Sequence, residues 1–234
     1  MSKTATKIES RPLRCFLPLF GLLASLCFVQ IAAAEDLVPL KLKLPAPAFV
    51  GTPPDAPKGA NIEPLSKLPR PPLLVPADVK NLAPASKISC SDTNATAAAL
   101  AKITDGDKEA NDTSIVLLRK GPQFVQFDLG SPQELFALVI WHAHDQAKVY
   151  RGVVAQVADD PAFEKDVQTL FNNDVENVCG RGVGTSRQYF ETNEGKLIDA
   201  KGVKARYVRL YSKGSTDSAL NEYTEVEIYG RSPK

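Results

Sequence analysis

The sequence has little of the material from which histidine-dependent and metal-dependent catalytic sites are built. It contains two histidines, one methionine and one tryptophan among 234 residues. It also lacks the Gly-x-Ser-x-Gly motif of serine hydrolases and the His-Glu-x-x-His motif of zinc proteases. The formal net charge is +1, which gives no support to a nucleic-acid-binding surface. The sequence therefore indicates a protein that is not an enzyme and does not bind nucleic acid.

The first 34 residues have the pattern of a secretory signal. Four basic residues between Lys3 and Arg14 precede an apolar run from Cys15 to Ile31, and residues 32–34 are all alanine. We therefore predict cleavage after Ala34 and a secreted or periplasmic mature protein. An uncleaved anchor is the alternative. The run is only about 17 residues long, the lower limit for crossing a bilayer, so we expect no stable membrane span after cleavage.

A proline-rich segment follows the signal. Residues 35–84 contain twelve of the eighteen prolines. Each proline removes a backbone donor and disfavours helix at the residue before it. We therefore predict that residues 35–78 form an extended linker or arm, much of it polyproline II. A spacer and a docking arm for a partner protein are both consistent with this composition.

From residue 79 onward proline becomes rare and β-forming residues cluster in short runs. The predicted strands are 124–130, 135–141, 149–157, 168–171, 188–191, 204–212 and 223–229. One alanine-rich patch, residues 97–103, is helix-like. Short strands at regular spacing predict an all-β domain, an antiparallel sandwich or barrel, over residues 79–232.

A series of motifs in this domain resembles a known family. The motifs are 81–83 (NLA), 103–107 (ITDGD), 124–130 (FVQFDLG), 155–160 (AQVADD), 206–211 (RYVRLY) and 225–230 (EVEIYG). In this order and spacing they resemble the discoidin domain, also called the coagulation factor 5/8 type C domain. Family 32 carbohydrate-binding modules are similar to it, within the galactose-binding-like superfamily. The resemblance implies a jelly-roll β-sandwich with loops at its two ends.

The resemblance also implies a structural calcium site. Many relatives bind Ca²⁺ with an Asp-Gly turn, main-chain carbonyls and a glutamate of the last strand. Asp105, Asp107, Thr113 and Glu225 match these positions, and Ca²⁺ takes six to eight oxygen ligands. An Asp-Gly turn with solvated carboxylates is the alternative.

The resemblance places ligand contacts at one loop end of the sandwich. His142, His144 and Asp145 follow the apolar run 135–141, and Asn221 ends a polar loop. Imidazoles donate and accept hydrogen bonds, as the recognition of sugar hydroxyls requires. Trp141 ends the apolar run and is expected in the core. We therefore predict that the domain binds a glycan or another surface component there. The alternative is a structural or protein-interaction module of the cell envelope that docks through its proline-rich arm.

Two cysteines remain after removal of the signal, Cys90 and Cys179. Export permits a disulfide between them, and two cysteines allow one pairing only. One disulfide and two separate thiols are both consistent with the sequence.

Overall fold

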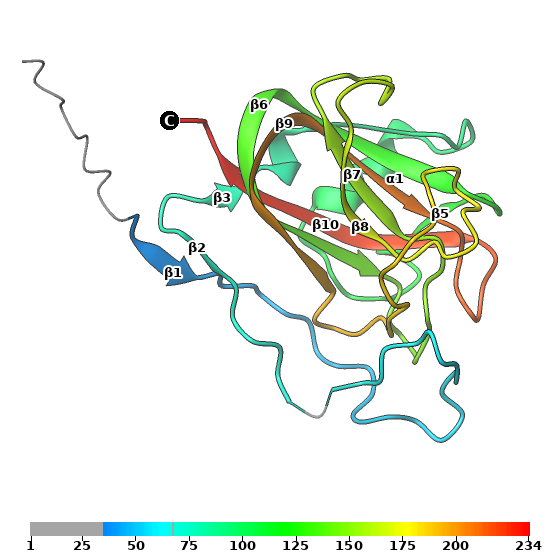
Figure 1. The fold of residues 1–234 in the computed structure, drawn as a ribbon. Coiled ribbons are helices and arrows are strands. Elements are labelled where there is room, and N and C mark those ends of the chain that lie inside the picture. Colours follow the sequence, from blue (N-terminus) through cyan, green and yellow to red (C-terminus); the bar gives the residue numbers. More distant parts are fainter. Residues whose placement is uncertain (1–34, 67) are drawn as a thin grey trace, which may run out of the picture. The chain divides into compact units, whose positions relative to one another are not determined.

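Two long strands, β6 (Gln123–His142) and β9 (Lys196–Ser212), form the frame of the fold. They pair with each other antiparallel along both of their halves. The ladder is interrupted between Asp128 and Gln133, where β6 bends and passes from one layer to the other. Each long strand therefore contributes one half to each of two layers (Figure 1). The computed structural model describes residues 35–66 and 68–234, so the predicted signal, residues 1–34, lies outside the described residues.

The other strands extend these two layers. The first half of β6 pairs with β4 (Lys87–Cys90). The second half of β9 pairs with β7 (Val154–Ala158), and β7 pairs in turn with β8 (Gln168–Asn172). The second half of β6 lies between the first half of β9 and β10 (Asn221–Arg231), and β10 also pairs with β3 (Lys80–Asn81) and β5 (Val116–Leu118). Short helices are η1 (Ala83–Ala85), α1 (Ala97–Ala101) and η2 (Lys102–Thr104). The predicted antiparallel β-sandwich is confirmed.

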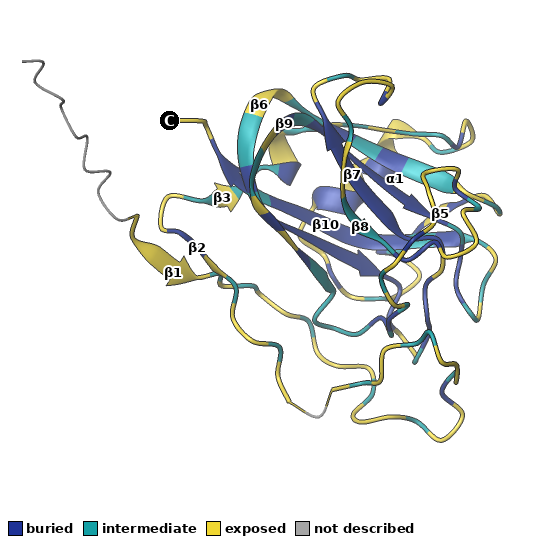
Figure 2. Ribbon diagram, in the orientation of Figure 1, coloured by how far each residue is buried: buried dark blue, intermediate teal, exposed yellow. Residues whose placement is uncertain are grey.

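Strand alternation produces the core between the layers. Val125 and Phe127 of β6, Val208 and Leu210 of β9, and Val226 and Ile228 of β10 are fully buried. Trp141 is buried too, as predicted, and its indole N–H donates to the carbonyl of Asn193. Figure 2 shows this continuous buried interior in dark blue, with exposure confined to loops and edges. Each fully buried side chain of this size stabilises the fold by about 1.5–3 kcal/mol.

Some predicted strand bounds are wrong. Residues 188–191 form only isolated bridges, in which Gln188 pairs with Ile62 and Phe190 with Val149. The predicted strand 149–157 begins only at Val154, because Gly152 with φ +61° turns the chain just before it. The strand β9 begins at Lys196, well before the predicted residue 204. Its first half alternates poorly because Lys201, with φ +53°, interrupts the pleat.

The proline-rich segment packs against the sandwich. Its first strand, β1 (Leu37–Pro39), pairs with β2 (Leu74–Pro76). The Arg231 guanidinium, at the end of β10, binds the carboxylates of Glu35 and Asp78 at the two ends of the segment. Residues Glu35–Lys234 form one compact unit, so the segment is part of the folded body. Within the part of the chain that the structure describes, no helix is long and apolar enough to cross a membrane.

Candidate functional site

The ends of several strands gather loops at one end of the sandwich. His142 at the end of β6 faces Tyr223 near the start of β10, and Val154 of β7 faces both Asn172 and Tyr211. We call the segments 119–123, 142–154, 172–196 and 212–221 the loop end (Figure 1). The predicted ligand residues lie in or beside these segments, so their surroundings test the sequence-based hypothesis directly.

Both histidines are buried below the loop end. The Nδ1 atom of His142 lies 2.9 Å from the Glu191 carboxylate, and its ring stacks on Tyr150 with centroids 4.2 Å apart. The Nε2 atom of His144 lies 2.9 Å from the carbonyl oxygen of Lys108. Neither side chain reaches solvent, since His142 is 0% and His144 2% exposed. A ligand arriving from solvent therefore touches neither ring in this conformation.

The other two predicted ligand residues differ in exposure. Asp145 is exposed, and its carboxylate pairs with the Lys148 ammonium at 2.9 Å. Asn221 is fully buried, and every polar atom of its side chain is hydrogen-bonded. It accepts from the Ser212 hydroxyl and the Gly214 N–H and donates to the carbonyls of Arg119 and Gly121. Asn221 therefore ties segment 212–221 to segment 119–123 of the loop end and has no donor left for a ligand.

Two basic residues that the sequence reasoning missed lie at the surface of the loop end. Arg151 and Lys213 both line two adjoining hollows of about 370 and 290 Å³. Backbone hydrogen bonds hold them at neighbouring positions: the Arg151 N–H donates to Gly214, and the Lys213 N–H donates to Arg151. Among the described residues no carboxylate lies within 4 Å of either charged group. Two basic residues that line the same hollows raise the local positive potential, which favours an anionic ligand there.

Three acidic residues also line the hollows, Asp174 and Glu176 the larger one and Asp217 the smaller one. The buried Asp174 carboxylate accepts from the N–H groups of Val178 and Cys179. The Asp217 carboxylate accepts from the Gln146 amide and lies 3.8 Å from the Lys148 ammonium. The smaller hollow is also lined by Ser215, Thr216 and Ser218, whose hydroxyls are of the kind that bind sugar oxygens.

Local sequence explains why these cations are adjacent. Gly152 follows Arg151, and a Cβ at Gly152 would lie 3.1 Å from the Lys213 Cβ and 3.3 Å from the Cys179 Sγ. Only a residue without a side chain allows the two segments to approach this closely. Each cation precedes a glycine in the sequence, but so do Lys120 and Arg181, so no sequence signal singles out this pair.

The structure brings part of the predicted calcium set together. The Gly106 N–H donates to the Glu225 carboxylate at 3.1 Å, so the Asp105–Asp107 turn lies against the last strand. Glu225 is buried, and this burial raises the pKa of its carboxyl group to about 8. Thr113 does not join the set, because its hydroxyl donates to the Asn111 side chain at 2.6 Å. Among the described residues no three His, Cys, Asp or Glu side chains are grouped as metal ligands.

The predicted disulfide between Cys90 and Cys179 is wrong: both cysteines are free. The Cys90 thiol, on β4, donates to the carbonyl of Asp92, whereas the Cys179 thiol donates to the carbonyl of Gly152 at the loop end. Cys179 packs against Val154 and Tyr211, in a cluster separate from the one that Cys90 adjoins. The structure therefore agrees with the other possibility given by the sequence, two separate thiols. Burial raises the pKa of the Cys179 thiol to about 12, so this thiol is a poor nucleophile.

Comparison with known proteins gives structural matches only: no family model and no curated protein sequence matches the chain. One similar solved structure is the CBM32 of AlyQ in complex with 4,5-unsaturated mannuronic acid. It is 20% identical over 60% of this chain and 92% of that one, with a TM-score of 0.43. Another is chitosan-binding module 1 of a chitosanase/glucanase from Paenibacillus sp. IK-5. It is 19% identical over 64% of this chain and 99% of that one, with a TM-score of 0.44.

A third match is the Family 89 glycoside hydrolase from Clostridium perfringens in complex with PUGNAc. It is 13% identical over 66% of this chain, with a TM-score of 0.45, and this chain spans 15% of that enzyme's length. The first two structures are carbohydrate-binding modules by name, and CBM32 is the family of modules that the sequence motifs resemble.

Proposed function

We propose that this chain is a non-catalytic carbohydrate-binding module that recognises an acidic saccharide at its loop end. The observation that carries the proposal is the pair Arg151 and Lys213, two cations at neighbouring positions that share two hollows and have no carboxylate partner within residues 35–66 and 68–234. Hydroxyl-bearing side chains at Ser215, Thr216 and Ser218 line the same surface. The resemblance to discoidin domains and the names of the similar solved structures support a carbohydrate ligand.

The chemistry of these groups selects an anionic sugar. A guanidinium or ammonium forms short hydrogen bonds to a carboxylate or sulfate that are about twice as strong as neutral ones. Each such bond contributes about 1.5–3 kcal/mol, whereas a bond between neutral groups contributes about 0.5–1.5 kcal/mol. An uronic acid or a sulfated sugar therefore gains more at Arg151 and Lys213 than a neutral sugar does. The ligand position differs from the one predicted from sequence, which centred on His142 and His144.

Arg151→Gln and Lys213→Gln are each expected to weaken binding of polygalacturonate about tenfold. Loss of one charge-assisted bond, about 1.4 kcal/mol, corresponds to that factor. Isothermal titration calorimetry of the mature chain, residues 35–234, measures the affinity. Binding should also weaken between 0.05 and 0.5 M salt, because screening acts on exposed charges.

The matched control is Lys204→Gln, which removes the same charge from an exposed position far along β9 from the loop end. It should leave the affinity unchanged. Equal affinity for polygalacturonate and neutral dextran would contradict the acidic specificity. Unchanged binding in the Arg151 and Lys213 variants would place the saccharide elsewhere.

We also propose that a calcium ion binds beside the Asp105–Asp107 turn with Glu225. The support is the buried Glu225 carboxylate, which accepts from the Gly106 N–H of this turn and whose pKa is raised by burial and by the nearby Asp105 charge; a cation would relieve both effects. Main-chain oxygens must replace the Thr113 hydroxyl, which is turned toward Asn111. Such an ion would be structural, since the turn lies away from Arg151 and Lys213.

Millimolar Ca²⁺ is expected to raise the melting temperature of the mature chain above its value in chelator. Free ion at 100 times its Kd stabilises the folded state by about 2.7 kcal/mol. Differential scanning calorimetry gives the shift, and Glu225→Gln should abolish it. Superimposable melting curves with Ca²⁺ and with chelator would show that no ion binds.

Export with cleavage after Ala34 stays a prediction, because those residues lie outside the described part of the chain. Docking to a partner through the proline-rich segment gains no support, since the segment's charged ends bind Arg231 of its own domain.

A further inference from the structure

The proline-rich segment is anchored to the loop end at several points besides the Arg231 contacts. The Glu63 N–H donates to the carbonyl of Gln188, and the Gln188 N–H donates to the carbonyl of Asn61. The Arg70 guanidinium donates to the carbonyls of Glu194 and Gly195 at 3.0 and 2.8 Å. These bonds hold residues 61–63 and Arg70 against the loop 187–196.

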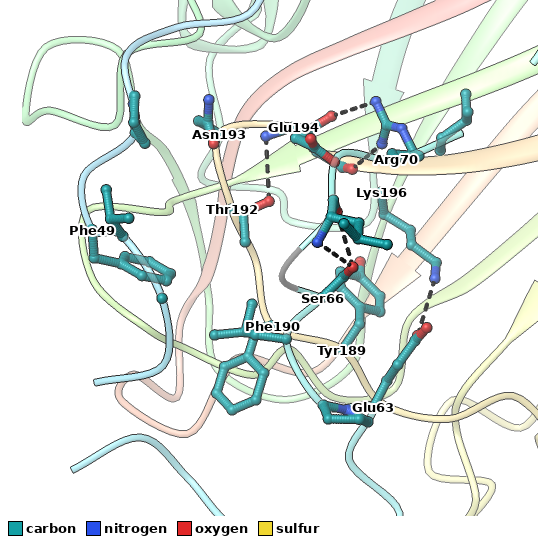
Figure 3. Close-up of a pocket in the computed structure, with 18 residues that line it drawn as sticks. Phe49, Glu63, Ser66, Arg70, Tyr189, Phe190, Thr192, Asn193, Glu194 and Lys196 are labelled. Carbon is teal, nitrogen blue, oxygen red and sulfur yellow. Dashed lines mark hydrogen bonds and ion pairs between the residues drawn. The ribbon is translucent and has the colours of Figure 1, made fainter. Parts of the chain in front are cut away.

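This folding back forms a hollow of about 430 Å³ between the segment and the loop. We call it the arm groove (Figure 3). One wall comes from the segment, with Phe49, Glu63 and Arg70, and the other from Tyr189, Phe190 and residues 192–197. Figure 3 shows the rings of Phe49 and Phe190 on one side of the groove and the charged side chains on the other.

The charges of the arm groove are balanced. The Lys196 ammonium lies 3.9 Å from the Glu63 carboxylate and sits over the Tyr189 ring, 4.7 Å from its centroid. Arg70 is held by two carbonyl oxygens beside the Glu194 side chain. Two cations thus face two carboxylates, and an anionic ligand gains no net attraction. At Arg151 and Lys213, by contrast, no carboxylate of the described residues lies within 4 Å of either cation.

The aromatic and polar groups of the groove define the ligand further. Phe49 and Phe190 are half-buried, so each offers ring surface to a ligand. The Asn193 amide donates to the carbonyl of Pro45, which leaves its side-chain carbonyl as an acceptor. The Thr192 hydroxyl accepts from the Glu194 N–H and retains its own proton as a donor. A sugar ring has an apolar C–H face and a hydroxyl edge, which match aromatic rings and amide or hydroxyl groups respectively.

We infer that the arm groove is a second saccharide site, and that it takes a neutral sugar ring with its apolar face against Phe49 and Phe190. The proline-rich segment is then half of a binding site and not a spacer. This inference extends the proposed carbohydrate recognition to a separate surface, and the two sites differ in the charge of their ligand. A polysaccharide that carries both neutral and acidic residues would engage both.

The test titrates the mature chain with cellohexaose, mannohexaose and laminarihexaose by calorimetry. We expect at least one of these neutral probes to bind with a Kd near 0.1–1 mM, an affinity typical of one stacked ring with few hydrogen bonds. Phe49→Ala should weaken that binding at least fivefold, whereas Phe49→Tyr, which keeps the ring, should retain it. Leu117→Ala, at an exposed apolar position on β5, is the matched control and should bind as the wild type does.

The double variant Arg151→Gln, Lys213→Gln separates this inference from the proposed function. It should lose polygalacturonate binding and keep the neutral probe. The inference is overturned if no neutral probe binds below 10 mM, if Phe49→Ala binds normally, or if the double variant loses the neutral probe as well. Failure of polygalacturonate with retained neutral binding would overturn the proposed acidic site alone. Equal melting temperatures of the Phe49 variants and the wild type establish that the fold is intact.

Discussion

Replacing Asn221 with alanine is expected to lower the free energy of unfolding by about 3–5 kcal/mol. The side chain is fully buried and satisfies the Gly214 N–H and the carbonyls of Arg119 and Gly121. Each buried backbone group left without a partner costs about 1–3 kcal/mol, and water entering the space offsets part of the sum. Urea denaturation of the mature chain measures the loss.

Asn94→Ala provides the control, because Asn94 is exposed and only its backbone N–H is hydrogen-bonded, to Asp92. It should change stability by less than about 0.5 kcal/mol. The comparison also decides the role of Asn221. If Asn221→Ala were as stable as the wild type and had lost only saccharide affinity, the side chain would be a ligand contact, as the sequence suggested.

Replacing Gly195 with alanine is expected to destabilise the protein by about 2–4 kcal/mol. A Cβ at this position would lie 2.6 Å from Cε2 of the buried Trp141 ring, closer than real side chains approach. The ring has nowhere to move, since its indole N–H is bonded to Asn193 and its side chain is fully buried. Forcing extra volume into a packed core costs about 1–3 kcal/mol, and the left-handed backbone adds about 1 kcal/mol for a residue with a Cβ.

Gly180→Ala separates the two contributions. Gly180 has the same φ as Gly195, +64°, but a Cβ there meets nothing within 4 Å. This variant should lose only the backbone cost of about 1 kcal/mol. Thermal denaturation of both variants gives the difference, which we assign to the contact with Trp141. Similar losses in the two variants would show that Trp141 is not packed against this turn.

The sequence predicted the sandwich well because apolar and polar side chains alternate clearly along several of its strands. Alternation in 204–212 and 223–229 places Val208, Leu210, Val226 and Ile228 in the core, and all four are buried. The prediction from sequence failed where the chain bends within a strand. The sequence has two strand-like runs separated by polar residues, whereas the structure has one bent strand, β6, from Gln123 to His142. Local periodicity indicates which face of a strand is buried, but it does not indicate whether two neighbouring runs belong to one continuous strand.

The proline-rich segment shows a different limit of sequence reasoning. Its composition correctly excludes helix, but composition does not reveal which distant groups supply the missing hydrogen bonds. Those partners are Arg231, Gln188 and the carbonyls of residues 194 and 195. They lie more than 100 residues away in the chain, so only the folded structure brings them to the segment.

The ligand position inferred from sequence stays a prediction, because no ligand contact has been established. The sequence-based position and the proposed site share one loop end, since the hollows lined by Arg151 and Lys213 lie among the loops near the end of the strand that contains Trp141. His142 was selected because the family resemblance places polar ligand contacts at that end. Burial under Tyr150 and the bond to Glu191 arise from contacts across the sheet that local pattern cannot predict. The cations were overlooked because isolated basic residues in loops are common on any protein surface.

The central claim, recognition of an acidic saccharide by Arg151 and Lys213, is tested most directly by a crystal structure. The mature chain would be crystallised with trigalacturonate at a concentration set by the measured Kd. The account predicts a ligand carboxylate between the two side chains, with its oxygens about 2.7–2.9 Å from the guanidinium or ammonium nitrogens. A trigalacturonate bound away from both residues, with Arg151 and Lys213 turned to solvent, would contradict it.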